Sequence, residues 1–364
     1  MNDQRGRRVV GIVDVAKEAG VAPSTVSRAF RDPDRVNPAT IEVIRQAAVR
    51  LGYEHRSYRR RAGRSSGIIS LVVKNVSEAE ELLRGAQDEA FLTGRAVSVI
   101  ESTRTSQWEN SFIEEVSNGS CGVLVASDRL NDAQLQRLAS LVPLVVLNRP
   151  VPGVASVMPD AVGGARQVLA LLKSNGHHAV TYVSAQGWDW ADRTRWDALR
   201  TIGRSMGMTM RVVGPFSPSV DGGGQAAMAL RGPSCPSAVV TYNEQMAAGM
   251  VTRMTAESVD VPGRLSVVAF DDSSISSVVS PNLTAVRLPR ARIGALGVRV
   301  LLALSSNGYT SMSAFTPEDV AALCLPDGTT AVGAGEIIGS NMLCVATTLF
   351  IRDSVAPAWR GDAH

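Results

Sequence analysis

The chain has 364 residues, of which 45% are hydrophobic and 20% are charged, the composition of a globular protein of two or three domains. It contains no uninterrupted run of about 18 apolar residues, which excludes a predicted membrane span. The polar, basic N-terminal residues lead into no apolar signal segment, so secretion is not expected and we predict a cytoplasmic protein.

The four cysteines are Cys121, Cys235, Cys324 and Cys344, and they lie far apart in the sequence. A zinc site requires closely spaced cysteines, so this spacing favours reduced thiols over a metal site or disulfides. We therefore expect no metal and no cofactor.

The net charge of +3 divides unevenly along the chain. Residues 1–66 carry a balance of +7, and residues 67–364 carry a balance of −4. A basic head on a mildly acidic body is typical of proteins that bind nucleic acid, because the DNA backbone is a polyanion. Basic segments also bind other anionic partners, so the asymmetry alone does not decide the partner.

The basic head begins with a predicted helix and a turn. Asp14 places negative charge in the first turn of this helix, and Gly20 supplies the left-handed residue that ends it. Val21 follows as a predicted buried residue of the turn. The apolar residues at helical spacing are Ile12, Val15, Ala16 and Ala19.

Two further helices are predicted after this turn. Pro23 suits the first turn of the second helix, which has Val26 and Phe30 as its inward face. Asn37 is placed to cap the third helix. The apolar residues of that helix are Ile41, Ile44, Ala48 and Leu51. Three short helices with a glycine-containing turn indicate a helix-turn-helix, whose second helix enters the major groove of DNA. Generic three-helix packing is the alternative.

The run from Asp14 to Arg28 (DVAKEAGVAPSTVSR) resembles the signature of the lactose-repressor (LacI/GalR) family of bacterial transcriptional regulators. The similarity continues through residues 36–40 and 51–53. The resemblance implies a homodimer that binds double-stranded operator DNA, with one head on each half-site.

The resemblance also implies roles for single residues of the head. It places Pro23, Ser24 and Arg28 against base edges, whereas Thr25, Ser27 and Tyr53 contact phosphate or brace the fold. Arg28 alone among them has the fork that contacts guanine O6 and N7, worth about 1–3 kcal/mol of discrimination. Gly11 and Ala22 replace the family's usual Thr and Ser, which removes two hydroxyls suited to capping a helix or holding phosphate.

Residues 54–66 occupy the position of the family's hinge and depart from its pattern. Typical members insert a pair of leucines into the minor groove and kink the operator, but this chain has no leucine between Leu51 and Leu71. The segment offers arginines instead. We predict that Arg59, Arg60 and Arg61 bind phosphate or a narrow minor groove, with a plain solvated linker as the alternative.

From Gly67 onward, short apolar runs alternate with amphipathic segments. This alternation predicts an α/β fold of parallel sheets covered by helices on both faces, with ligands at the carboxyl ends of the strands. The expected strands are 68–73, 96–100, 122–126, 144–147, 179–184, 238–241 and 265–270. The expected helices include 78–92, 132–141, 162–174, 195–206, 225–230 and 244–257.

The body also resembles the effector-binding core of the same family, a two-subdomain fold like that of type I periplasmic binding proteins. The most specific landmark is the run from Val261 to Asp272 (VPGRLSVVAFDD). The resemblance implies a DNA-binding domain at 1–53, a hinge at 54–66, and an effector-binding and dimerisation core at 67–364. Residues 305–345 exceed the family's usual length, so we expect an insertion there.

A pocket for a small polar effector such as a sugar is implied by the same resemblance. The matching residues are Asn75, Asp160, Arg195, Asn243, Glu244 and Asp271. Trp188 and Trp190 offer an aromatic face for a sugar ring. Structural alternatives remain: an ion pair or a turn cap for Arg195 and Asn243, a core position for Trp190, and a turn cap for Asp271 with Asp272.

One departure concerns the loop from Lys74 to Glu78, which lacks the aromatic residues that the family uses to line the pocket. This departure leaves open a regulator that binds DNA without a small effector. A solute-binding protein would share the core but would not carry a helix-turn-helix. An enzyme is not expected, because the chain has no nucleophile elbow, no His-Glu-x-x-His motif and no phosphate-binding Gly-rich loop.

Overall fold

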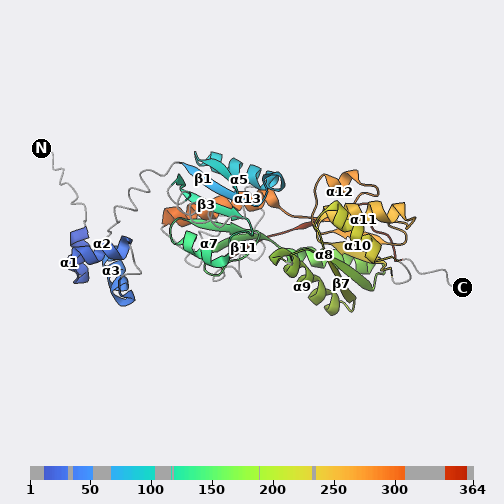
Figure 1. The fold of residues 1–364 in the computed structure, drawn as a ribbon, viewed down its shortest axis with the longest axis horizontal. Coiled ribbons are helices and arrows are strands. Elements are labelled where there is room, and N and C mark those ends of the chain that lie inside the picture. The colour runs from blue at the N-terminus through green and yellow to red at the C-terminus, as the bar shows by residue number, and fades with distance from the viewer. Residues whose placement is uncertain are drawn as a thin grey trace. The chain divides into compact units, whose positions relative to one another are not determined.

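The computed structural model describes residues 12–31, 36–51, 67–102, 116, 119–187, 189–231, 235–307 and 341–358. The chain divides into two compact units, residues 1–66 and 67–364 (Figure 1). The roles expected for Tyr53, Arg59, Arg60, Arg61 and Trp188 fall outside the described residues and stay predictions.

The described part of the first unit consists of three helices, α1 (Ile12–Ala19), α2 (Pro23–Arg31) and α3 (Pro38–Leu51). Gly20 has a φ of +65°, the left-handed conformation that ends α1. Asn37 accepts a hydrogen bond from the Ala39 N–H at 2.9 Å at the start of α3. The core consists of Val15, Ala16, Val26, Ala29, Ile44, Ala47 and Ala48. The predicted apolar stripes therefore face one another.

The described residues of the second unit form two six-stranded sheets, and we call each sheet with its helices a lobe. In the first lobe the strand order is β11-β5-β4-β3-β1-β2, and all neighbours are parallel. Its strands are β1 (Ile68–Val73), β2 (Ala96–Glu101), β3 (Gly122–Ala126), β4 (Leu144–Leu147), β5 (Ala155–Pro159) and β11 (Met342–Val345). Its helices are α5 (Glu80–Leu92), α7 (Asp132–Ala139) and α13 (Arg290–Asn307).

In the second lobe the strand order is β12-β10-β9-β8-β6-β7, and only the edge pair β10–β12 is antiparallel among the described strands. Its strands are β6 (Ala179–Ala185), β7 (Thr209–Phe216), β8 (Ala238–Thr241), β9 (Ser266–Ala269), β10 (Thr284–Arg287) and β12 (Thr348–Phe350). Its helices are α8 (Ala161–Ser174), α9 (Trp190–Ser205), α10 (Val220–Ala229), α11 (Glu244–Ala256) and α12 (Ile275–Val278).

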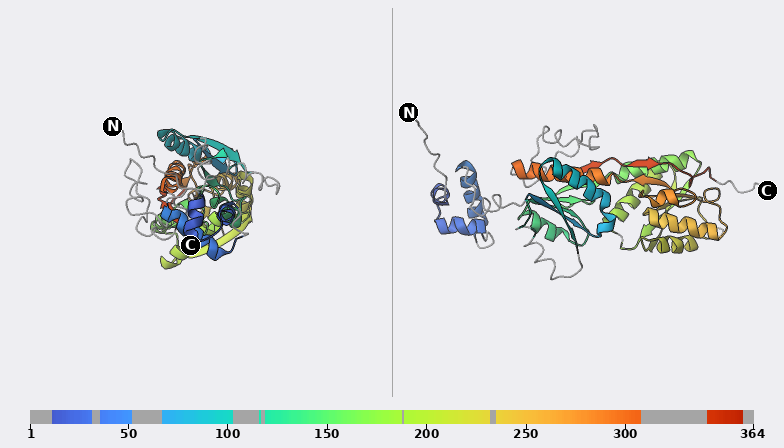
Figure 2. Two further views of the ribbon diagram at one scale, coloured as in Figure 1. Left: turned by 90° about the vertical axis from the view of Figure 1, so that its left-hand side faces the viewer. Right: turned by 90° about the horizontal axis from the view of Figure 1, so that it is seen from above.

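Helices cover both faces of each sheet (Figure 2). Successive strand residues point to opposite faces, so Leu71 and Leu124 pack under α5 and α13, whereas Val72 and Val123 pack under α7. The described chain crosses between the lobes after β5, after β10 and between β11 and β12. The predicted α/β fold with two subdomains is confirmed.

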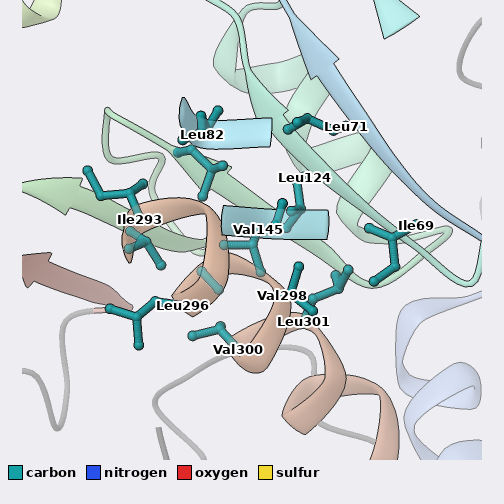
Figure 3. Close-up of a cluster of buried hydrophobic side chains, with 14 of the residues drawn as sticks. Ile69, Leu71, Leu82, Leu124, Val145, Ile293, Leu296, Val298, Val300 and Leu301 are labelled. Atoms are coloured by element: carbon teal, nitrogen blue, oxygen red, sulfur yellow. The ribbon is translucent and has the colours of Figure 1, made fainter. Parts of the chain in front are cut away.

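The cluster around α13 forms one of the two hydrophobic cores of the first lobe, on the opposite face of the sheet from α7 (Figure 3). Helices α5 and α13 cross at backbone contact, because a Cβ added to Gly85 would lie 1.8 Å from the Ala291 carbonyl oxygen. A Cβ on Gly294 would lie 2.1 Å from the Leu82 carbonyl oxygen. These two glycines therefore fix α13 to the first lobe.

The expected insertion at 305–345 stays a prediction, and elements of the fold lie at both of its ends. Helix α13 continues to Asn307, and residues 342–345 form β11, which pairs in parallel with β5. Residues 308–340 lie outside the described part of the chain. The structure also adds elements that the expected set does not contain, namely β5, β7, β10, β11, β12, α12 and α13. None of the helices in the described ranges has the length and apolar character needed to cross a membrane.

Candidate functional site

Helix α2 separates its apolar and polar side chains onto two faces. Val26 and Ala29 are buried in the core of the head, and Thr25 and Ser27 are half-buried at its boundary. The residues expected against base edges, Pro23, Ser24 and Arg28, are exposed. Arg28 has no hydrogen-bond or ion-pair partner among the described residues. Its guanidinium group is therefore available to an external acceptor.

Four of the predicted effector residues come from neighbouring elements of the second lobe. Arg195 lies on α9, Asn243 and Glu244 follow β8, and Asp271 follows β9. Because β8 and β9 are parallel neighbours, the residues after them lie at the same edge of the sheet. We call these four residues the strand-end cluster.

Arg195 is buried, with 7% of its surface exposed. Its guanidinium carbon lies 4.7 Å from the centroid of the Tyr242 ring and 5.1 Å from that of Phe270. Its Nη1 donates a hydrogen bond to the Tyr242 carbonyl oxygen at 2.7 Å. Two aromatic faces attract the cation and hold its orientation, so Arg195 both braces the end of β8 and presents a fixed donor group.

Asn243 and Asp160 act as helix caps, which for Asn243 is the structural alternative. Asn243 Oδ1 accepts from the Met246 N–H at 2.9 Å at the start of α11, and its Nδ2 donates to the Pro218 carbonyl oxygen at 3.2 Å. Asp160 Oδ1 accepts from the Gly163 N–H at 2.8 Å at the start of α8. In each residue, therefore, at least one polar side-chain atom already forms a hydrogen bond within the protein.

Asp271 is 6% exposed and forms a bidentate ion pair with Arg290, the first residue of α13. Arg290 Nη1 donates to Asp271 Oδ1 at 2.8 Å, and Nη2 contacts Oδ2. Asp271 Oδ1 also accepts from the Asp272 N–H at 2.9 Å, as expected of a turn cap. Burial lowers the pKa of Arg290, but the Asp271 carboxylate, together with the nearby Glu244 and Glu81, raises it above the ordinary value.

Glu244 is buried in the same cluster, with 9% of its surface exposed. Burial raises the pKa of Glu244, and the nearby charge of Asp271 raises it further. Arg290 attracts both carboxylates. The two acids therefore share one cation supplied by the other lobe.

Asn75 and Trp190 stand apart from this cluster. Asn75 is exposed and caps the 3-10 helix η2 (Val76–Glu78), where its Oδ1 accepts from the Ser77 N–H at 3.1 Å. Trp190 is half-buried at the first position of α9. Among the described residues, no hydrogen bond or ring contact joins either side chain to Arg195, Asn243, Glu244 or Asp271.

Sequence reasoning missed a buried carboxylate beside the cluster. Asp192 is fully buried and accepts hydrogen bonds from the Tyr182 hydroxyl at 2.7 Å and the Ser184 hydroxyl at 2.6 Å. Asp189 caps α9 and accepts from the Tyr242 hydroxyl at 3.1 Å. Asp189, Asp192 and Arg195 recur at three-residue spacing from the cap of α9 into its first two turns, which is the sequence signal that would have found them.

A separate groove of about 430 Å³ lies on the second lobe beside β7 and α10. It is lined by Thr181, Arg211, Val212, Val213, Ala229, Leu230, Arg231 and Pro236. None of the predicted effector residues lines this groove. The described part of the chain has no cluster of His, Cys, Asp or Glu suited to a metal ion, and none of its three cysteines forms a disulfide.

Comparison with known proteins supports both units. Residues 11–55 match the family described as bacterial regulatory proteins, lacI family, and residues 169–328 match the periplasmic binding protein-like domain. The chain is 31% identical to the HTH-type transcriptional regulator GalS of Salmonella typhimurium, over 85% of this chain and 94% of that protein.

Two solved structures share the fold. The transcriptional regulator CelR–cellobiose complex has a TM-score of 0.62 at 23% identity, covering 95% of this chain and 99% of the other. The lac repressor dimer bound to operator and the anti-inducer ONPF has a TM-score of 0.63 at 21% identity, covering 96% and 100%.

The helix-turn-helix head and the two-lobed core together define a bacterial regulatory protein that binds DNA. Within that class, the chain belongs to the lacI family of transcriptional regulators.

Proposed function

We propose that this regulator is a repressor that binds operator DNA as a homodimer and releases or holds it in response to a small polar effector such as a sugar. The observation that carries the effector half is the strand-end cluster, where Arg195 lies clamped between two rings beside the buried acids Glu244 and Asp271. Convergent polar groups with aromatic support are what a small polyol requires. The solved complex of CelR with cellobiose supports a sugar as the class of ligand.

The DNA half of the proposal rests on the exposed face of α2. Pro23, Ser24 and Arg28 would contact base edges, with Thr25 and Ser27 at the boundary. Tyr53 and the arginines 59–61 would contact the phosphate backbone. Replacing these three arginines with Ala should then flatten the salt dependence of DNA binding by about one unit of log–log slope per lost contact. An unchanged slope would mean that these three arginines face solvent and do not contact phosphate.

Thermal-shift measurements with a panel of neutral monosaccharides and disaccharides test the effector half. A ligand should stabilise the wild type, and Asn243→Ala and Arg195→Ala should remove that stabilisation. Arg200→Ala is the matched control, because Arg200 lies on the same helix and pairs with Asp197 at the surface. Stabilisation that persists in the first two variants would place the effector elsewhere.

Exposed apolar side chains support the homodimer. Phe91 and Leu92 at the end of α5 are 81% and 73% exposed, and Val278 at the end of α12 is 78% exposed. Large apolar side chains gain free energy when a partner surface covers them. Sedimentation velocity should therefore show a dimer that Leu92→Glu or Val278→Glu weakens, whereas a monomer with full operator affinity would contradict the proposal.

One observation favours the alternative, a regulator without a small effector. Both carboxylate oxygens of Asp271 are already held by Arg290, so the cluster satisfies part of its own hydrogen-bonding capacity. If no ligand of the panel binds, this alternative replaces the effector half of the proposal and leaves the DNA half intact.

A further inference from the structure

The ion pair between Asp271 and Arg290 differs from an ordinary structural ion pair in where its partners come from. Asp271 follows β9 of the second lobe, whereas Arg290 begins α13, which packs on the sheet and on α5 of the first lobe. The pair therefore joins the two lobes at the strand-end cluster. The Arg290 side chain is 27% exposed and the Asp271 side chain 9%, so the pair lies at the boundary between the interior and solvent.

We propose that Arg290 is an internal occupant of the effector site, and that a ligand binds by replacing the Arg290 guanidinium on the Asp271 carboxylate. This inference rests on the proposed function for the position of the site. A guanidinium group donates two parallel hydrogen bonds to one carboxylate. In the strand-end cluster, Arg290 of the same chain supplies these two bonds to Asp271.

The chemistry of the exchange limits the class of ligand. A carboxylate only accepts hydrogen bonds, so a replacement for Arg290 supplies two neighbouring donors, such as vicinal hydroxyls or an amino group. Glu244 is buried close by and adds a second negative charge. When the Arg290 guanidinium moves away, Arg195 remains as the cation of the cluster beside two acids, so a phosphate or carboxylate on the ligand would add negative charge to a site that has just lost a cation. The site therefore takes neutral or cationic polyhydroxy ligands and excludes anionic ones.

A matched ion pair on the same helix provides the control. Arg299 lies on α13 and pairs with Glu89 of α5 at 2.9 Å, with 20% and 12% of the two side chains exposed. Both partners belong to the first lobe. Gly85 and Gly294, where α5 and α13 cross at backbone contact, precede Glu89 and Arg299 by about one helical turn on the same two helices. The Arg299–Glu89 pair resembles the Arg290–Asp271 pair in charge and burial, but it lies outside the strand-end cluster.

Chemical rescue in the full chain tests the proposal without knowledge of the natural effector. In Arg290→Ala, methylguanidinium chloride should raise the Tm by about 2 °C over sodium chloride at equal ionic strength. The rise should be absent in the wild type, where Arg290 occupies the site, and in Arg299→Ala. It should also be absent in the Asp271→Asn, Arg290→Ala double variant. Glucose 6-phosphate should not replace methylguanidinium.

A second variant covers the case in which Arg290→Ala does not fold. In Asp271→Ala the guanidinium of Arg290 remains, and sodium acetate should raise the Tm, whereas acetate should not affect Glu89→Ala. Equal rescue at the two ion pairs, or none at Asp271 and Arg290, would overturn the proposal. Rescue without any sugar binding to the wild type would keep this inference and count against the proposed effector alone.

Discussion

The polar face of α2 and the strand-end cluster use polar side chains in opposite ways. On α2, Ser24 and Arg28 are exposed, and Arg28 has no partner within the described residues. In the cluster, Arg195 and Asp271 are more than nine-tenths buried and bonded to the protein itself. The donors on α2 are therefore available to a partner molecule, whereas the polar groups of the cluster form hydrogen bonds within the protein.

This difference follows from the size and charge of what each surface is built to bind. DNA is a large polyanion that reaches exposed arginines directly, and its affinity comes mostly from charge. A small ligand has few groups, so its site must hold its own groups in place beforehand. As a consequence, the residues that would bind the ligand in the strand-end cluster are also needed for the stability of the fold. Substitutions in the cluster should therefore change stability, and substitutions on α2 should change binding alone.

The largest expected effect is on the stability of the second lobe in Asp192→Ala. The Tyr182 and Ser184 hydroxyls would lose their buried acceptor, and an unsatisfied buried group costs about 1–3 kcal/mol. The free energy of unfolding should fall by about 3 kcal/mol, measured by urea unfolding of the full chain. Asp197→Ala on the exposed side of α9 should stay within about 0.5 kcal/mol. Equal losses in the two variants would contradict the structural role of Asp192.

A smaller effect is expected for Arg28→Lys, and it should appear in DNA binding only. Lysine keeps the positive charge but loses the fork that contacts guanine, so the preference for operator over random DNA should fall by about 1–3 kcal/mol. Fluorescence anisotropy with both DNAs measures that preference. Binding to random DNA and the Tm of the head should stay near the wild-type values. A lower Tm of the head in Arg28→Lys would mean that Arg28 is needed for the fold, as the residues of the strand-end cluster are.

The smallest expected effect is the pH dependence contributed by His177. This side chain is buried, and its Nδ1 and Nε2 lie 2.9 and 3.1 Å from the Ser237 and Ser266 hydroxyls. Burial lowers the pKa of His177, with a partly opposing hydrogen bond to the Ala356 carbonyl. The folded state therefore favours the neutral ring, and its contribution is complete above the unfolded pKa of about 6.5.

As the pH falls below that value, the unfolded state binds a proton that the folded state does not. Stability should then fall by up to about 1.4 kcal/mol per pH unit until the folded pKa is reached. Denaturant unfolding at several pH values should show a shallower acid dependence for His177→Gln than for the wild type. His178→Gln is the control, because His178 is the exposed neighbour. Identical profiles for the two variants would remove His177 from this account.

The head could be predicted from the sequence because its signals are local. Helical spacing, the glycine after Ala19 and the cap at Asn37 each act within a few residues, and the structure confirms all three. Helix α13 shows the opposite case. Gly294 and Gly297 weaken its helical pattern, although Gly294 is required by the close approach of Leu82 from α5.

The strand-end cluster could be predicted only in part, because some of its residues follow from local signals and others meet only through the packing of distant segments. Arg195, Asn243, Glu244 and Asp271 follow from their places at strand ends and on α9. Arg290 could not be predicted, because it meets Asp271 only when a helix of one lobe reaches the sheet of the other. The edge strand β7 was also out of reach, since most of its residues are exposed and lack an alternating pattern.

The central claim is that α2 reads a specific operator through Arg28 as part of a two-fold dimer. Selection of the full chain against random double-stranded DNA tests it directly. The account predicts enrichment of a near-palindromic site with two half-sites, and loss of guanine preference at one position of each half-site in Arg28→Ala. Enrichment of no sequence, or of a sequence that Arg28→Ala binds equally well, would contradict it.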